Sequence, residues 1–117
     1  MQELIWKDRK RTIFGLPLSF TVYELTEKKL LISTGFFHTI QREIDLYEMN
    51  DFELSRSLIQ KIFGVGDIII HSSDTDTPTF VIESVKEPYK IKELLDQERE
   101  RERIRKAKDG TFKEIKT

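Results

Sequence analysis

Short apolar runs, each followed by a polar or glycine-containing turn, fill the first 84 residues of the chain. The densest run is the isoleucine triplet 68–70, which closely follows Gly64 and Gly66. Glycine suits backbone that turns sharply or takes a positive φ, and β-branched residues favour a pleated, largely buried strand. Residues 63–72 are therefore predicted to form a tight turn that leads into a buried strand.

Segments with strand character lie on both sides of this run. Residues 36–46 alternate between two kinds of position, and this near period of two is typical of a long half-buried strand. Asn50 and Asp51 indicate a bend, the apolar spacing within 58–63 indicates a short helical turn, and 73–78 is a strong turn signal. The other predicted strands are 4–6, 19–25, 30–33, 52–55 and 79–84.

One helix is predicted near the end of the chain, at about residues 88–108. Pro88 suits the first helical position, where its missing N–H costs nothing. Beyond an apolar stripe, Gln97–Arg103 has no apolar side chain, and its opposite charges lie three or four residues apart. We therefore expect a solvated helix extension there, followed by a mobile tail at 109–117. The stripe consists of Tyr89, Ile91, Leu94 and Leu95.

The order of elements defines the fold class. Six or seven strands precede a single helix, and strands and helices do not alternate, which excludes a doubly wound α/β fold. A sheet of this kind hides its edges by bending into a small barrel or roll, and the helix stripe would then close an open end. The chain of 117 residues is predicted to be one mainly β domain, with strands at about 3–84.

Charge and composition limit the classes of partner. The 20 lysines and arginines nearly balance 21 acidic residues, so the net charge of -1 does not indicate a nucleic-acid partner. The chain has no cysteine, which excludes disulfides, thiolate metal ligands and cysteine nucleophiles. The first residues do not resemble a signal peptide, and no apolar run approaches the roughly 20 residues that span a bilayer. A cytoplasmic location is expected, with peripheral contact at the inner face of a membrane as the alternative.

Six segments carry a resemblance to a known family, and they are 23–30, 34–36, 44–46, 51–54, 62–68 and 85–95. In this order they resemble the bacterial pleckstrin-homology-like (PH-like) domain family. The resemblance covers about residues 15–95 and implies a strongly bent antiparallel barrel closed by a C-terminal helix. It also implies a module that binds lipid headgroups, peptides or other proteins. The first hairpin carries only Lys28 and Lys29 of the basic pattern, so the resemblance does not extend to inositide binding.

No set of residues indicates catalysis, a metal or a cofactor. Gly64 and Gly66 are followed by Ile69 where a dinucleotide fingerprint has its third glycine, and a strand follows instead of a helix. His38 and His71 could bind a transition metal together with Asp74 or Asp76. Turn chemistry explains both aspartates, however, so we predict no metal site. The chain is expected not to be an enzyme.

The most suggestive cluster is basic and lies near the N-terminus. Basic residues beside anionic lipid contribute about 1 kcal/mol each, and an exposed apolar loop can enter the headgroup layer. In the alternative interpretation the charges are solvated and the apolar residues cover the barrel. The candidate headgroup residues are Lys7, Arg9, Lys10, Arg11, Lys28 and Lys29, and the candidate membrane or partner loop holds Ile13, Phe14, Leu16 and Leu18.

Two functions remain open at this point. The first is a non-catalytic PH-like adaptor that binds an unknown protein or peptide, or a second copy of itself. The alternative is a peripheral membrane module that binds anionic lipid headgroups through the basic N-terminal cluster. Neither function requires a nucleic acid, a metal or a cofactor.

Overall fold

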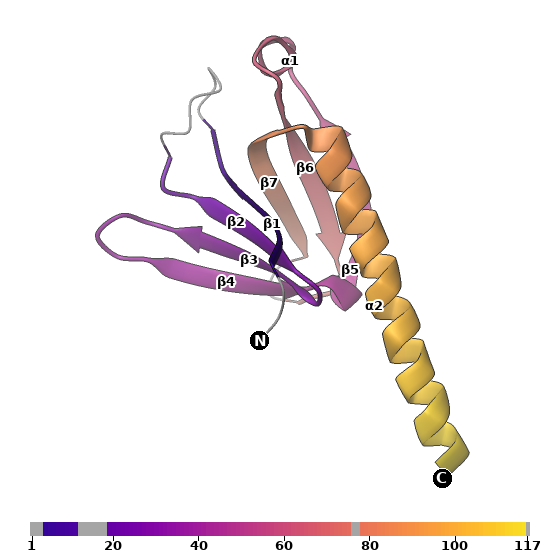
Figure 1. The fold of residues 1–117 in the computed structure, drawn as a ribbon. Helices are drawn as coiled ribbons and strands as arrows, with labels where there is room; N and C mark the ends of the chain where they lie inside the picture. The colour runs from indigo at the N-terminus through magenta and orange to yellow at the C-terminus, as the bar shows by residue number, and fades with distance from the viewer. Residues whose placement is uncertain (1–3, 12–18, 76–77, 117) are drawn as a thin grey trace.

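The computed structural model describes residues 4–11, 19–75 and 78–116, with side chains up to residue 108 (Figure 1). Within these residues, seven strands form two antiparallel sheets, in the orders β1-β2-β3-β4 and β5-β6-β7. The first sheet contains β1 (Leu4–Arg9), β2 (Val22–Thr26), β3 (Lys29–Thr34) and β4 (Ile40–Asp45), and the second contains β5 (Met49–Ser55), β6 (Val65–Ser72) and β7 (Thr79–Lys86). The helices are the 3-10 turn η1 (Leu46–Glu48), α1 (Leu58–Ile62) and α2 (Pro88–Lys116). The predicted mainly β fold with a terminal helix is confirmed.

The core lies between the two sheets and the first turns of α2. Its centre is β6, where Ile68 and Ile70 are fully buried and Gly64 begins the turn with a φ of 71°. A Cβ on Gly66 would lie 2.8 Å from the ring of Pro88, so this position leaves no room for a larger residue. The predicted tight turn and buried strand are confirmed. The other core side chains include Tyr23, Leu25, Leu30, Ile44, Leu46, Met49, Ile82, Val85 and Leu95.

The two sheets meet along one corner, where β1 lies beside β7, and do not form one continuous barrel (Figure 1). The backbone N–H of Arg11 donates to the Ser84 carbonyl at 2.9 Å. The hydroxyl of buried Tyr23 accepts a hydrogen bond from the Glu83 N–H at 3.0 Å. Burial raises the pKa of Tyr23 to about 12, although the bond from Glu83 opposes part of this rise. The phenol is therefore neutral at physiological pH and joins the two sheets.

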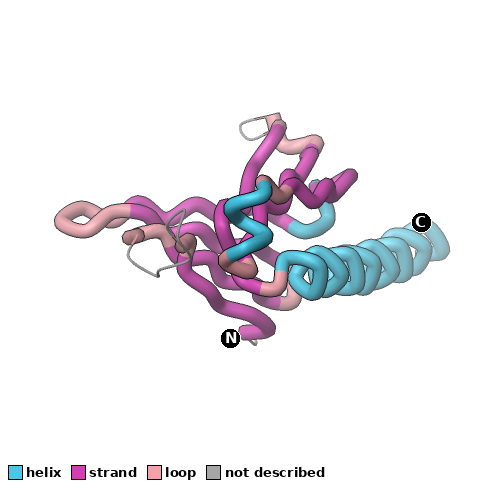
Figure 2. The backbone as a smooth tube through the Cα atoms, turned by 90° about the horizontal axis from the view of Figure 1, so that it is seen from above, coloured by secondary structure: helices cyan, strands magenta, loops and turns pink. Residues whose placement is uncertain are grey.

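Two strand predictions need correction. Residues 36–39 lie outside β4, and only Ile44 and Leu46 of the predicted inward positions are buried. The tip of the β3–β4 hairpin projects away from the second sheet, which leaves Ile40 59% exposed (Figures 1 and 2). Asn50 and Asp51 belong to β5 instead of a bend, and the pairing with β6 is irregular between Met49 and Asp51.

Helix α2 also differs from its prediction. Its backbone stays helical to Lys116, past the expected end at Lys108 and through the expected tail. Seen from above, it runs beside the sheets and extends beyond them (Figure 2). Tyr89 is exposed because a helix turns about 100° per residue, which places it opposite Ile91.

The predicted solvated extension of α2 is wrong for one face. Glu98 and Glu102 are only 4% and 3% exposed. On the side toward β5, Arg99 donates from Nη1 to the Asn50 carbonyl at 2.5 Å, and Arg103 donates from Nη2 to the Met49 carbonyl at 2.8 Å. These bonds attach the helix to the β5 edge, so polar side chains extend the packing where the apolar stripe ends.

Candidate functional site

The six candidate headgroup residues do not form one cluster. In the register of β1 and β2, Leu4 lies opposite Thr26 and Arg9 lies opposite Val22. The β2–β3 turn with Lys28 is thus beside the start of β1, whereas Arg9 is at its end. At about 3.4 Å per residue, these positions are about 17 Å apart along the strand. The structure therefore separates Lys28 and Lys29 from the basic end of β1.

Half of these cations already have an acidic partner. Lys10 pairs with Glu83 on β7, Arg11 pairs with Asp8 at 2.6 Å, and Lys29 pairs with Glu43 at 3.0 Å. The hydrogen bond to Glu43 raises the pKa of Lys29. Arg9 donates from Nη1 to the Ser19 carbonyl at 2.8 Å, while Lys7 and Lys28 form no ion pair within the described part of the chain. The candidate loop residues Ile13, Phe14, Leu16 and Leu18 lie outside the described residues.

An aromatic patch that the sequence did not single out lies at the tip of the β3–β4 hairpin. The Phe36 ring is 4.8 Å from Phe20 and 4.6 Å from Phe37, measured between centroids. Phe37 is 97% exposed. Gly35 permits the turn because its φ is 109° and a Cβ there would collide with the His38 carbonyl. We call Phe20, Phe36, Phe37 and Ile40 the aromatic tip.

A second exposed apolar surface is the short helix α1. Ser57 and Gln60 form a capping box, in which the Ser57 hydroxyl accepts from the Gln60 N–H and the Gln60 side chain accepts from the Ser57 N–H. The cap stabilises a helix that has no buried residue, and Leu58 is 75% exposed. The predicted short helical turn is confirmed, and its apolar residues face outward. Its exposed apolar residues are Leu58, Ile59, Ile62 and, directly after it, Phe63.

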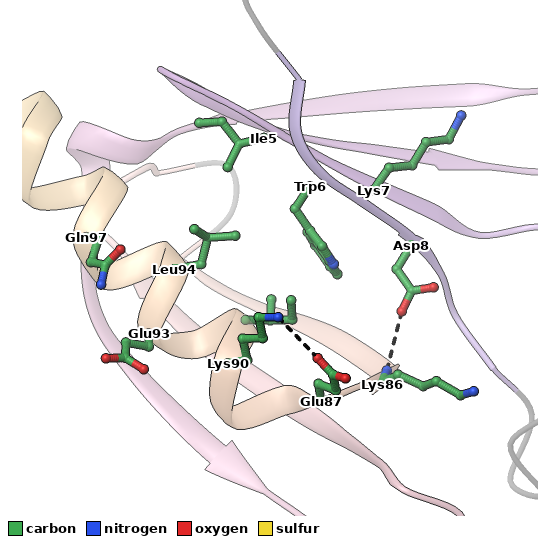
Figure 3. Close-up of a pocket in the computed structure, with 11 residues that line it drawn as sticks. Ile5, Trp6, Lys7, Asp8, Lys86, Glu87, Lys90, Glu93, Leu94 and Gln97 are labelled. Carbon is green, nitrogen blue, oxygen red and sulfur yellow. Dashed lines mark hydrogen bonds and ion pairs between the residues drawn. The ribbon is translucent and has the colours of Figure 1, made fainter.

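A groove separates β1 from α2 (Figure 3). It begins as a cavity of about 600 Å³, where Ile5, Trp6 and Leu94 point into the space between strand and helix. A second cavity of about 460 Å³ shares Ile5, Leu94 and Gln97 with the first and continues along α2 to Arg105. We call these adjoining cavities the β1–α2 groove. Sequence reasoning missed it because residues about 85 positions apart form its two walls.

The two histidines lie in different parts of the fold. His38 belongs to the exposed β3–β4 loop, and the Nε2 atom of His71 on β6 lies 3.3 Å from Glu53 Oε1. Asp74 lies in the turn after β6, and Asp76 is outside the described residues. Across residues 4–11, 19–75 and 78–108, no three histidine, aspartate or glutamate side chains are grouped so that they could hold a metal ion.

The antiparallel sheets, the corner between β1 and β7 and the closing helix agree with the comparison with protein families. The family model described as Bacterial PH domain matches residues 14–99. The chain belongs to the bacterial PH domain family. Domains of this family are in general non-catalytic binding modules, and the resemblance seen in the sequence is confirmed. Comparisons with curated proteins and with solved structures find no match. No helix in the described part is long and apolar enough to cross a membrane.

Proposed function

We propose that this bacterial PH domain is a non-catalytic module that binds a protein or a peptide, with self-association as one form of that activity. The observation that carries the proposal is the amount of exposed apolar surface at the aromatic tip and on α1. Contiguous exposed apolar surface on a soluble domain typically marks an interaction site, and aromatic residues are enriched in the centre of protein interfaces.

The paired cations support a protein partner over a lipid headgroup. Lys10, Arg11 and Lys29 each face a carboxylate, so a lipid phosphate would have to displace an existing partner. Among the described residues, the aromatic tip has no comparable internal partner, since its rings pack mainly on one another. A protein surface that covers these rings would gain apolar burial without breaking an ion pair.

Sedimentation velocity and chemical crosslinking test the proposal on the full chain. We expect self-association, or capture of a defined partner, that weakens when Phe36 and Phe37 are both changed to serine. Ile104→Ser is the matched control because Ile104 is also exposed but lies on α2. A strictly monomeric chain that captures no partner would contradict the proposal. If both variants weakened binding equally, the aromatic tip would not be the interaction site.

One observation favours an anionic membrane as the second candidate. The described segments 19–22 and 33–42, which form the aromatic tip and its surroundings, contain no acidic residue, whereas Arg42 and His38 lie within them. Aromatic side chains beside cations suit the membrane–water interface. In this case the chain should sediment with anionic vesicles, not neutral ones, and binding should weaken at physiological salt.

The basic N-terminal residues provide a separate test of the membrane candidate. Changing Lys7, Arg9, Lys10 and Arg11 together to alanine should abolish vesicle binding if these residues contact headgroups. Binding that survives this change but is lost in the Phe36→Ser, Phe37→Ser variant would assign membrane contact to the aromatic tip. No binding to vesicles of either kind would remove the membrane candidate.

A further inference from the structure

Part of the outer edge of β1 faces the β1–α2 groove. The Lys10 N–H donates to the Thr21 carbonyl on the β2 side, and the next N–H, that of Arg11, donates to Ser84 on the β7 side, both at 2.9 Å. Because successive residues of a strand alternate in this way, the N–H and C=O groups of Lys7 point away from β2 and toward the groove. An edge of this kind can pair with an added strand.

The groove also offers an apolar floor beside this edge. Ile5, Trp6 and Leu94 are each only partly buried and pack on the core below them. The cavity above them, about 600 Å³, is within the usual range for sites that enclose a ligand group. Trp6 is the only tryptophan of the chain, so its fluorescence reports directly on this floor. One large apolar side chain of a bound segment would fit over it.

The charges along the groove have an order. Most of them are already paired, and the pairs are Asp8 with Arg11, Glu87 with Lys90, Glu98 with Arg101, and Glu102 with Arg105. Among the described residues, Lys7 and Lys86 remain without an ionic partner at the Asp8 end, and Glu93 and Glu27 remain without one toward the Leu4 end. The side chains of Lys7, Lys86 and Glu93 point away from the space between β1 and α2, so these charges lie at the rim of the groove (Figure 3). The rim is therefore basic at one end and acidic at the other.

We propose that the β1–α2 groove binds an extended peptide as an added antiparallel strand on β1. This inference rests on the proposed function, because it names a peptide as ligand. Every strand pairing in both sheets is antiparallel, so the added strand is expected to run antiparallel to β1. Because β1 runs from Leu4 toward Asp8, the N-terminus of the peptide would lie at the Lys86 end. Charge complementarity then requires an acidic residue, a large apolar residue over Trp6 and a basic residue, in that order from the N-terminus of the peptide.

Selection from a displayed library of random peptides tests this inference. The groove from Glu87 to Arg105 spans about 27 Å of helix, so peptides of about nine residues are long enough to fill it. We expect enriched peptides with the acidic, apolar, basic order. A synthetic copy of one enriched peptide, titrated into the full chain, should change the Trp6 fluorescence as the indole becomes covered.

Two variants separate the groove from other surfaces. The exchange Lys86→Glu with Glu93→Lys should weaken binding of the selected peptide about tenfold, since it reverses two exposed charges. The control exchange Lys61→Glu with Glu100→Lys, on exposed residues outside the groove, should leave the affinity unchanged. Lys7→Pro removes the N–H that the added strand needs and should also prevent binding, with circular dichroism as the test of folding.

The outcomes distinguish this inference from the proposed function. Enriched peptides that leave Trp6 fluorescence unchanged and bind the exchange variant equally well would show that the groove is not the binding site. Peptide binding at another surface would then still hold. A selection without any enriched peptide would overturn the inference, while protein binding would still be decided by sedimentation and crosslinking. If a folded Lys7→Pro variant bound normally, the added strand would be wrong even with binding in the groove.

Discussion

Two consecutive parts of α2 attach to the same sheets by different physical means. The first part buries Ile91 and Leu95 against the core, as an amphipathic helix does. The second part, from Asp96 to Arg105, uses arginines that donate to β5 carbonyls and glutamates that pair along the helix. A helix can therefore continue to pack after its apolar stripe has ended when most of its buried polar groups find a partner, although Arg99 Nε is buried without a hydrogen-bond partner among the described residues.

The largest effect is expected in the apolar part. Leu95→Ala should lower the free energy of unfolding by about 3 kcal/mol, because it removes a fully buried side chain and leaves a cavity. Urea denaturation measures the loss. Tyr89→Ala, on the exposed side of the same helix, is the control and should change stability little. If Leu95→Ala lost less stability than one of the arginine variants described below, the apolar stripe would not dominate the attachment of α2.

A smaller but clear loss is expected at Arg99. Its guanidinium donates to Asn50 and lies 4.8 Å from the centre of the Phe52 ring, so Arg99→Ala should cost about 2 kcal/mol. Arg99→Lys keeps the charge but not the planar group and should recover only part of this loss. Full recovery with lysine in urea denaturation would mean that charge alone holds this part of the helix.

Arg103 makes a similar but simpler contact. It donates to the Met49 carbonyl, and no cation–π contact of its guanidinium is found among the described residues, so Arg103→Ala should cost about 1 kcal/mol. Hydrogen exchange of the amides in β5 should rise in the same variant, because the helix no longer covers that edge. Lys108→Ala, an exposed position further along α2, serves as the control. Unchanged exchange in β5 would contradict the edge-covering role.

The smallest effect is expected at Lys92. Its pair with Asp96 lies within one helix, both side chains are partly exposed, and Asp96 keeps Arg99 as a second partner, so Lys92→Ala should cost less than about 0.5 kcal/mol. Thermal unfolding at low and high salt should show that even this small loss decreases as salt is added. A loss as large as that of Arg99 would end the distinction between pairing within the helix and bonding to β5.

Local sequence pattern located the elements well where one face of an element is covered along its whole length. The isoleucines of β6 and the pair Ile91 and Leu95 of α2 were placed correctly because period and side-chain type indicate burial. The same argument overestimated the strand at 36–46. There the period was present, but the second sheet does not reach the hairpin tip, so Ile40 is exposed.

The candidate site depended on contacts that no local pattern contains. Lys10 and Glu83 are 73 positions apart, as are Arg11 and Ser84, and Asp8 is 78 positions from Lys86. Four of the six basic residues are close together in the sequence, yet Lys10 pairs with a carboxylate of β7, and the strand register keeps Lys28 and Lys29 away from the other four. The groove between Trp6 and Leu94 likewise exists only because β1 and α2 come together.

By itself, the sequence determined the mainly β class, the family, the buried β6 strand and the apolar start of α2, because periodicity and residue type act over a few neighbours. Only the tertiary structure decided that Glu98 is buried, that the aromatic tip is exposed and that β1 presents an edge to a groove. Burial and pairing are properties of two surfaces in contact, and the second surface here comes from residues far away in the chain.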